Sequence, residues 1–572
     1  MNRFFYTLRK YPVARLFAFF LAVAAGVFLL LFFTRSVLRK PFLSEISPSV
    51  GSPGDTLFLR GENFGNSRGS SYVELCGNRL TESGYISWED DLIKVIVPGN
   101  TDDGLVYVVT RAGKSNPEFF VNELAIPVEL PKNPMSVVPI ISELSETEAA
   151  VGQVISIIGR NFGSSRGDSN VYWTTYKGID RDVNIPDIKE SGMAEKKTYP
   201  GFVTPSEADF DYEYWNENEI RVRVPEGAES GSVFVATNDG RSALQPFVVK
   251  SRAGVKNMTS LHTYLIQVGA DFYNIKGSND AAVTIHLPRP VTFAWQPQAI
   301  LTESDPAPAL LEYRGTSIFQ VTPADKTSAK NSAGARQNFV VTSCGLECEI
   351  NKDYVAPFRE KDRMLYKAYT RSDEIIPSNK KEVLELLPNI IFQVKNPYRQ
   401  AELIFDWFVA NYKVLPKNRN GDADPLDLIR KKKGDAYDFA VLYAALLRAA
   451  GVPCRVLSGV LIDSDKHTRN HWWNEFYIEN YGWVPVDTAV GAGMEFKAFQ
   501  SERNSGKYYF GNIDAQRVVF SLDYKVLKQS LLSNKTVRVP RTFALQSIWE
   551  ESTADVESYS SYWIVPAVLG IY

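Results

Sequence analysis

Two stretches of this chain repeat each other at a constant distance, and this repeat constrains the fold more than any other feature. Residues Gly61–Gly69 read GENFGNSRG and residues Gly159–Gly167 read GRNFGSSRG, and 159 minus 61 gives an offset of 98. The offset is 127 for a later pair, Ile93–Pro98 and Ile220–Pro225. The second copy therefore carries about 29 extra residues, which we place in the polar stretch 175–211.

Each copy has the pattern of a small antiparallel β-sandwich, with short alternating strands separated by Gly, Asn and Pro. Gly61 opens a tight turn in which Asn63 tolerates a left-handed conformation and Phe64 packs beneath. The copies resemble IPT/TIG domains, immunoglobulin-like modules of bacterial surface proteins. The resemblance implies display or adhesion and places the modules at 41–123 and 138–250. The insertion in the second copy is a candidate recognition loop or a plain surface excursion.

The N-terminal region contains one long apolar run. Leu16–Phe33 has no charged residue, and as a helix its 18 residues would span roughly 27 Å, close to the thickness of a bilayer core. We favour an uncleaved signal-anchor over a signal peptide cleaved near Ala22–Ala24, because more apolar residues follow that tripeptide. Basic residues flank the run on both sides, so the positive-inside rule speaks only weakly. We expect residues 1–40 to form a cytoplasmic stub and anchor, with the bulk of the chain periplasmic or on the cell surface.

A third group of motifs lies further along the chain. It reads GDAYDFA from Gly434, HWWNE from His471 and GWVPVD from Gly482. These motifs resemble the core of the transglutaminase-like superfamily, related to papain-like cysteine enzymes, whose pattern begins G-x-C-x-D/E-F-A. The resemblance implies that Ala436 occupies the position of the nucleophilic cysteine. It also implies that His471 and Asp487 match the catalytic histidine and aspartate.

The helix that carries the nucleophile position is expected to begin at this motif, with Asp435 as its N-cap and Asp438 in its first turn. A thiol at that position has a lowered pKa, because helix N–H groups and the helix dipole favour the thiolate. A methyl group cannot attack a carbonyl, and loss of a comparable nucleophile costs on the order of 10⁶ in rate. We therefore expect an inactive core that retains a peptide groove beside Tyr437, Trp472 and Trp473.

The remaining segments complete the domain plan. Alternating apolar residues predict a further β-domain over 257–350. The resemblance places a transglutaminase-like domain over 352–572, with its core at about 396–521. Pro397–Tyr412 reads as an amphipathic helix, with Ala401, Ile404, Phe405, Phe408 and Val409 on its apolar face. A shorter helix is expected to be capped by Asp424.

Four cysteines do not make a disulfide framework for a chain of this length. Cys344 and Cys348 would close a small loop only in an oxidising compartment, and Cys454 reads as core packing. The spacing of His467 and His471 suits a helix, but this segment reads as loop and strand, so we expect no metal site and no cofactor.

The sequence thus predicts a multidomain chain: a transmembrane helix, two immunoglobulin-like sandwiches, a further β-domain and an α+β transglutaminase-like core. A net charge of −3 argues against nucleic-acid binding. We expect a membrane-anchored pseudoenzyme of the bacterial cell envelope that binds a protein or peptide ligand. The first alternative is an active cysteine-dependent acyltransferase or amidohydrolase seen as a Cys-to-Ala variant. The second is a structural surface or adhesion protein that uses the IPT/TIG modules.

Overall fold

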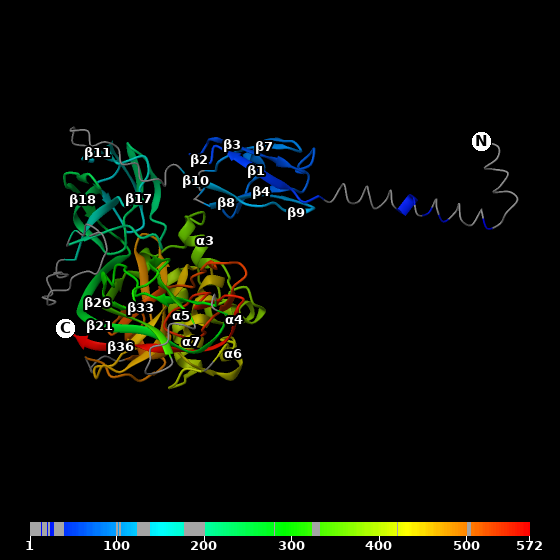
Figure 1. Ribbon diagram of the computed structural model, residues 1–572. Coiled ribbons are helices and arrows are strands. Elements are labelled where there is room, and N and C mark those ends of the chain that lie inside the picture. Colours follow the sequence, from blue (N-terminus) through cyan, green and yellow to red (C-terminus); the bar gives the residue numbers. More distant parts are fainter. Residues whose placement is uncertain are drawn as a thin grey trace. The chain divides into compact units, whose positions relative to one another are not determined.

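The computed structural model describes residues 39–98, 101, 104–122, 138–176, 199, 201–278, 281–322, 332–419, 421–499 and 505–572, and isolated positions before residue 28. These residues form two compact units, one ending at Met135 and one from Ser136 to Tyr572 (Figure 1). The predicted membrane span Leu16–Phe33 lies almost entirely outside the described residues. Within the described part of the chain, no helix has the length and apolar character needed to cross a membrane.

The first unit contains a β-sandwich built from two sheets. Their strand orders are β1-β3-β7-β6 and β2-β10-β8-β4-β5, and β9 pairs with β8. The strands are β1 (Phe42–Ser47), β2 (Val50–Gly51), β3 (Thr56–Glu62), β4 (Tyr72–Leu75), β5 (Asn78–Arg79), β6 (Tyr85–Trp88), β7 (Leu92–Ile96), β8 (Gly104–Thr110), β9 (Gly113–Lys114) and β10 (Glu118–Asn122), with a 3-10 turn at Glu82–Gly84. Buried and exposed residues alternate along most of these strands, as expected for sheets with one buried face.

The second unit opens with a sandwich of the same strand order, β11-β13-β17-β16 and β12-β20-β18-β14-β15, with β19 on β18. Its strands are β11 (Ile140–Leu144), β12 (Glu148–Ala149), β13 (Val154–Arg160), β14 (Asn170–Thr175), β15 (Phe202–Val203), β16 (Tyr212–Trp215), β17 (Glu219–Arg223), β18 (Ala228–Thr237), β19 (Gly240–Arg241) and β20 (Gln245–Val249). The matching orders confirm the internal repeat. Most of the predicted insertion at 175–211 lies outside the described residues.

The repeated turn is the same in both sandwiches. Asn63 and Asn161 have φ angles of 63° and 64°, in the left-handed region predicted for this position. A β-carbon on Gly61 or on Gly159 would lie 2.0 Å from a backbone carbonyl oxygen of the neighbouring strand, so only glycine fits there. Phe64 is buried beneath the turn, as expected.

Two larger sheets follow, with orders β23-β26-β21-β36 and β24-β25-β22-β35-β34, and β32 pairs with β26. The strands are β21 (Gly254–Gly277), β22 (Val283–Pro288), β23 (Gln298–Asp305), β24 (Leu310–Tyr313), β25 (Thr316–Val321), β26 (Ser332–Ile350), β32 (Asn512–Ile513), β34 (Lys535–Val537), β35 (Glu550–Ser552) and β36 (Val556–Ile571). The C-terminal strands β35 and β36 pair with β22 and β21. The predicted domain border near residue 350 is therefore corrected, since both sheets contain strands from before and after that residue. The sequence did not reveal this, because pairing between distant strands leaves no trace in local alternation.

The remaining elements build the helical core around a sheet of order β31-β30-β29-β33. The strands are β29 (Cys454–Ile462), β30 (Thr468–Ile478), β31 (Gly482–Val486) and β33 (Arg517–Leu522), with the short pair β27 (Lys413–Val414) and β28 (Lys433–Gly434) beside them. The helices are α3 (Met364–Thr370), α4 (Lys381–Ile391), α5 (Pro397–Asn411), α6 (Asp427–Lys431), α7 (Ala436–Ala449), α8 (Thr488–Gly491) and α9 (Ser505–Tyr508), with a 3-10 turn at Lys352–Tyr354.

This core sheet is covered on two sides. One apolar cluster joins it to helices α4, α5 and α7, and a second joins β29 and β33 to strands β21 and β22. Helix α7 lies along β30 and β29, and Figure 1 shows α4, α5, α6 and α7 gathered in one part of the second unit. Every residue of β29 is buried, which explains why this strand reads as an almost continuous apolar run.

Two helix predictions can be compared with the structure. Helix α5 confirms the predicted amphipathic helix, and the Asn396 side chain caps it by accepting a hydrogen bond from Arg399 N at 3.0 Å. Four residues of its predicted apolar face are buried, but Val409 is 38% exposed, so its assignment to that face was wrong. Helix α6 begins at Asp427 rather than beside Asp424, because the Asp424 carboxylate accepts a hydrogen bond from Leu426 N at 2.9 Å in the turn before the helix.

Cys344 and Cys348 are free thiols on one strand, β26. They are four residue steps apart along extended strand, which is roughly 13 Å. A disulfide needs Cα atoms within about 7 Å, so the small loop that an oxidising compartment would permit cannot form here. Burial raises the pKa of both thiols to about 12.

Candidate functional site

Helix α7 starts where the sequence predicted. The Asp435 carboxylate accepts a hydrogen bond from Asp438 N at 3.1 Å, and the Asp438 carboxylate accepts one from Asp435 N at 2.9 Å. This reciprocal pair is a capping box and confirms Asp435 as the N-cap. Ala436 is the first residue of the helix and is buried.

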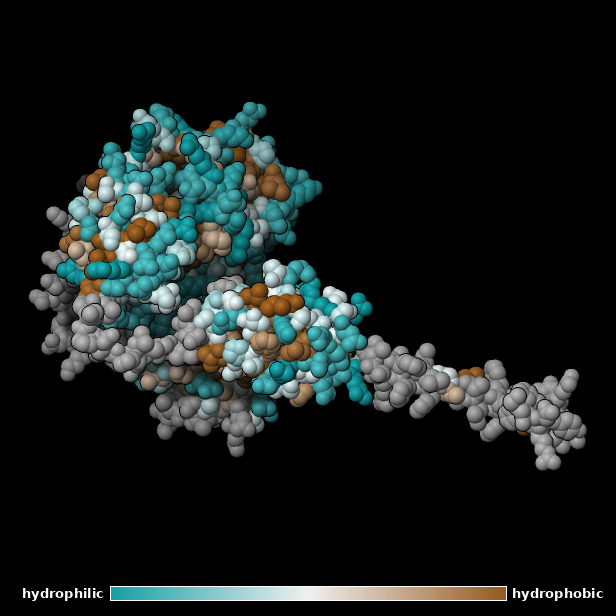
Figure 2. Space-filling model, turned by 90° about the horizontal axis from the view of Figure 1, so that it is seen from above, coloured by the Kyte–Doolittle hydropathy of each residue, from teal (hydrophilic) through white to brown (hydrophobic). Residues whose placement is uncertain are grey.

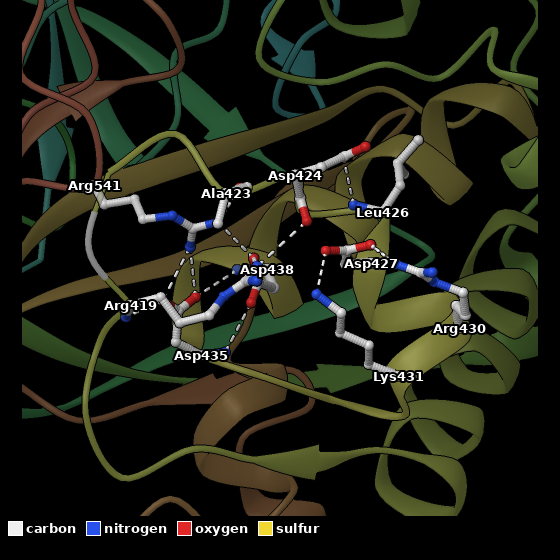
Figure 3. Close-up of polar contacts among 10 residues, drawn as sticks. All are labelled: Arg419, Ala423, Asp424, Leu426, Asp427, Arg430, Lys431, Asp435, Asp438 and Arg541. Atoms are coloured by element: carbon white, nitrogen blue, oxygen red, sulfur yellow. Dashed lines mark hydrogen bonds and ion pairs between the residues drawn. The ribbon is translucent and has the colours of Figure 1, made fainter.

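Two arginines make hydrogen bonds to the capping carboxylates (Figure 3). No local sequence pattern pointed to either arginine. Arg541 donates to both oxygens of Asp435 at 2.7 and 2.9 Å and to Asp438 at 2.8 Å. The backbone N–H of Arg419 donates to Asp435 at 2.6 Å, and its guanidinium bonds Asp438. Burial, and then the neighbouring Asp435 charge, raise the pKa of Asp438, while the two arginines oppose that rise. The start of α7 is thus fixed by a buried cluster of two cations and two carboxylates.

His471 and Asp487 lie together, on strand β30 and directly after β31. His471 Nε2 is 2.6 Å from Asp487 Oδ2, and both side chains are buried. The other oxygen of Asp487 accepts a hydrogen bond from Val490 N at 3.0 Å and caps helix α8. Burial alone would raise the pKa of Asp487, but the charges of His471 and Arg517 outweigh it, so this pKa lies well below its usual range.

Arg517 extends this pair into a longer chain of contacts. Its guanidinium donates to Asp487 at 2.6 Å and to Asp514 at 2.7 Å, and the Tyr509 hydroxyl donates to Asp514 at 2.7 Å. Arg517 is the first residue of strand β33. In the sequence, the one pattern that hinted at its ion pair with Asp487 was a single charged residue at the start of an apolar strand.

The first turn of α7 lies along the segment of β30 that carries His471. The Tyr437 ring meets the Trp472 ring at 5.3 Å, and Asn474 donates to the Ala440 carbonyl at 2.9 Å. The Trp473 ring stacks near the His471 ring at 5.8 Å. Among the described residues, His471 Nδ1 is buried and has no hydrogen-bond partner. The structure therefore gathers the sequence-predicted site residues around one end of α7.

The predicted groove residues are interior side chains. Tyr437, Trp472 and Trp473 are all buried, as is Ala436. This part of the chain offers no thiol in place of the methyl group. Cys454 is fully buried at the start of β29, and burial holds its pKa far above the ordinary thiol range. The arrangement can orient an imidazole, and the first position of α7 carries a methyl group where cysteine enzymes carry the nucleophilic thiol.

The segment before His471 makes ion pairs instead of a metal centre. Asp463 accepts hydrogen bonds from Arg469 at 2.8 and 2.9 Å, and His467 Nδ1 lies 3.7 Å from the same carboxylate. Within the described residues, no group of three or more His, Cys, Asp or Glu side chains is placed to hold a metal ion.

Comparison with known proteins identifies two of these regions. Residues 385–488 match the transglutaminase-like superfamily and residues 41–121 match the IPT/TIG domain. The chain thus carries a transglutaminase-like core and an IPT/TIG domain within a multidomain, mostly β-sheet fold.

Curated relatives match only parts of the chain. An uncharacterized protein of Haemophilus influenzae is 31% identical over 169 residues, which cover 24% of this chain and 46% of that protein. A cyclomaltodextrin glucanotransferase of Paenibacillus macerans is 30% identical over 83 residues, 14% of this chain and 11% of that enzyme. The chain therefore spans less than half the length of each of these relatives.

Similar solved structures include the periplasmic domain of TgpA from Pseudomonas aeruginosa, with 12% identity and a TM-score of 0.23, covering 42% of this chain and 88% of that one. They also include SGBP-B from a xyloglucan utilization locus of Bacteroides uniformis, with 9% identity and a TM-score of 0.13, covering 54% of this chain and 99% of that one. These TM-scores are too low to support a conclusion about this chain.

Proposed function

We propose that this chain is a membrane-anchored, extracytoplasmic protein whose transglutaminase-like core is catalytically inactive and acts in protein or peptide binding at the cell envelope. One observation carries the proposal. Ala436 is the first residue of helix α7, which lies beside strand β30, and β30 carries His471 of the His471–Asp487 pair. Acyl transfer or amide hydrolysis of the cysteine type needs a thiolate at that position, and a methyl group has no electron pair to donate.

The residues around Ala436 support its assignment to the nucleophile position of a cysteine-enzyme core, rather than to the start of a helix with no such origin. A capping box presents the first turn, and His471 keeps a carboxylate on one ring nitrogen while the other nitrogen is buried without a partner among the described residues. In a cysteine enzyme that free nitrogen would face the thiol.

The remaining elements of the proposal concern placement and binding. Leu16–Phe33 is proposed as the anchor, with the two sandwiches and the core outside the cytoplasmic membrane. Because Tyr437, Trp472 and Trp473 are buried, ligand binding at the proposed groove requires these rings to move. Fractionation followed by protease treatment of spheroplasts tests the placement: we expect digestion of the chain from the outside, and full protection overturns this part.

A second candidate function is an active cysteine enzyme of which this sequence is a Cys-to-Ala variant. The observation in its favour is the His471–Asp487–Arg517 arrangement, in which a carboxylate orients the imidazole as a cysteine enzyme of this class requires.

Restoring the thiol tests whether the site retains an activating geometry, which both candidate functions require. In Ala436→Cys, alkylation by iodoacetamide at about pH 6, followed by peptide mass spectrometry, measures thiolate formation. We expect labelling at least tenfold faster than in the matched variant Ala436→Cys/His471→Ala. We also expect the unmodified chain to show no glutamine deamidation, amine incorporation or casein hydrolysis. Turnover by the unmodified chain that His471→Ala abolishes overturns the inactive assignment. Equal labelling of both thiol variants shows that the site geometry is lost.

A further inference from the structure

The first sandwich exposes apolar side chains on the outer face of one sheet. Leu105 on β8 is 42% exposed and Phe119 on β10 is 54% exposed, and the two residues are directly paired across the strands. Val50 on β2, 41% exposed, is paired with Val121 on the other side of β10. We call these four residues the outer strip. A solvated sheet face normally carries polar residues, so the outer strip is unusual. Elsewhere Figure 2 shows apolar residues in small groups among many hydrophilic ones.

Aromatic rings and charges adjoin the outer strip. Tyr107 follows Leu105 on the same face of β8, and Lys114 Nζ lies 3.6 Å from the centre of its ring while bonding Glu74 at 3.0 Å. The Arg79 guanidinium lies 4.2 Å from the centre of the Tyr72 ring. An apolar centre with aromatic rings and a polar rim is the usual composition of a protein-binding surface.

The second sandwich provides an internal comparison for the same face. The repeat offset of 127 pairs Leu105 with Ser232 and Phe119 with Pro246, since both strands keep the same register (Gly104–Phe120 and Gly231–Phe247). The offset of 98 likewise pairs the apolar Val50 with a charged glutamate at position 148. At three of these four positions the second sandwich thus carries a smaller or a polar residue, whereas the counterpart of Val121 is Val248, also an exposed valine.

The second sandwich also shows what covers the aromatic part of this face. Phe234, the counterpart of Tyr107, is fully buried under Tyr199 and Phe202, with ring centroids 5.0 and 4.9 Å away. Tyr199 lies in the chain between β14 and β15, and Phe202 is the first residue of β15. In the first sandwich β4 and β5 are joined by Cys76 and Gly77 alone. The first sandwich thus presents the face without the segment that covers it.

We propose that this face of the first sandwich binds an extended polypeptide segment of a partner protein, and that aromatic side chains of that segment pack on Tyr107 and the outer strip. The segment takes the place that Tyr199 and Phe202 fill in the second sandwich. Aromatic anchors that become fully desolvated supply most of the affinity at such surfaces. This site is independent of the function proposed for the core.

The covering segment itself gives the probe. We would measure fluorescence anisotropy of a labelled peptide, YPGFVTP, the sequence of residues 199–205, against the full chain. We expect saturable binding that weakens at least tenfold in Leu105→Ser/Phe119→Ser. The matched control Val248→Ser, an equally exposed residue (44%) of the second sandwich, should bind as the unmodified chain does. A peptide with both aromatic residues replaced by alanine should not bind.

Three results overturn the proposal. The first is absence of saturable binding, and the second is equal affinity for the double variant. The third is concentration-dependent dimerisation of the full chain in sedimentation that the double variant abolishes, because it assigns the face to a second copy. Thermal unfolding checks that the double variant is folded. If the double variant is not folded, the comparison of YPGFVTP with its alanine-substituted version, both measured against the unmodified chain, tests the proposal: equal affinity for the two peptides overturns it.

Discussion

Replacing Arg541 with alanine tests whether the buried charge cluster holds the start of helix α7. The Arg541 side chain is 2% exposed and makes three hydrogen bonds to Asp435 and Asp438, both fully buried. Without it, Arg419 is the remaining cation of the cluster and bonds only one of these side chains through its guanidinium. Removing one partner of a buried ion pair costs about 3–5 kcal/mol, because the charge left behind is neither solvated nor paired.

Hydrogen exchange of the α7 amides is the appropriate assay, because the loss falls on one local segment of a multidomain chain. Each 1.4 kcal/mol changes an equilibrium constant tenfold, so about 3–5 kcal/mol speeds exchange by roughly 10²–10³·⁵. Burial and the neighbouring Asp435 already raise the pKa of Asp438, and loss of Arg541 raises it further. A raised carboxyl pKa gives stability at low pH that is lost as pH rises through the folded pKa. The variant's deficit is therefore larger at about pH 8 than at about pH 5.

Arg430 is the matched control in the same region (Figure 3). Its guanidinium donates to Asp427 at 2.8 Å, a distance like those in the buried cluster, but its side chain is 77% exposed. Arg430→Ala should cost less than about 1 kcal/mol, since water screens an exposed pair. If Arg541→Ala costs no more than Arg430→Ala, or if its deficit shrinks as pH rises, the cluster does not hold the helix as argued.

Three further changes have defined outcomes. Burial opposes the charged form of Asp487, but His471 and a neighbouring arginine hold its pKa well below the usual range. The contribution of Asp487 to the free energy of unfolding is therefore fully present above about pH 4 and is lost as the pH falls from there toward the folded pKa. Asp487→Asn should therefore cost about 3–5 kcal/mol in urea denaturation at neutral pH, and this cost should shrink progressively as the pH falls below about 4 toward the folded pKa; a pH-independent cost would contradict this. Gly159→Ala places a β-carbon 2.0 Å from the Ile140 carbonyl oxygen and should lower the melting temperature of the second sandwich, whereas an unchanged melting temperature would show that the turn relaxes freely. Cys454, fully buried with a raised pKa, should resist iodoacetamide until the chain unfolds; native labelling at neutral pH would count against the packing described here.

The parts of the fold that the sequence predicted are those written in local patterns. The N-cap of α7 follows from two aspartates three residues apart, and a capping box depends on nothing more distant. The resemblance to the family pattern pointed to His471 and Asp487, and the two can meet because a tight turn joins β30 to β31; Asn480 in that turn has the positive φ of 62° typical of such turns. The repeated turn of the sandwiches could be predicted because it, too, depends only on a short local sequence.

The features that the sequence did not reveal depend on long-range contacts. Arg541 reaches Asp435 across 106 residues, and Arg517 reaches Asp487 across 30. Neither arginine belongs to a local motif that distinguishes it from a surface cation. The closure of the β-domain by strand β36 is a pairing of the same kind, with partners almost 300 positions away. Local alternation identifies a strand but does not name its neighbour.

The same contacts also explain why a histidine–aspartate pair can persist without a nucleophile. Asp487 neutralises Arg517, binds His471 and caps helix α8, all in the interior. Loss of this carboxylate would leave a buried guanidinium short of a partner and an open helix end, a cost that applies whether or not the site reacts. Persistence of the pair is therefore accounted for by stability, and it does not by itself indicate catalysis. Only a restored thiol, whose reactivity depends on the imidazole and not on the fold alone, distinguishes a retained active-site geometry from a structural remnant.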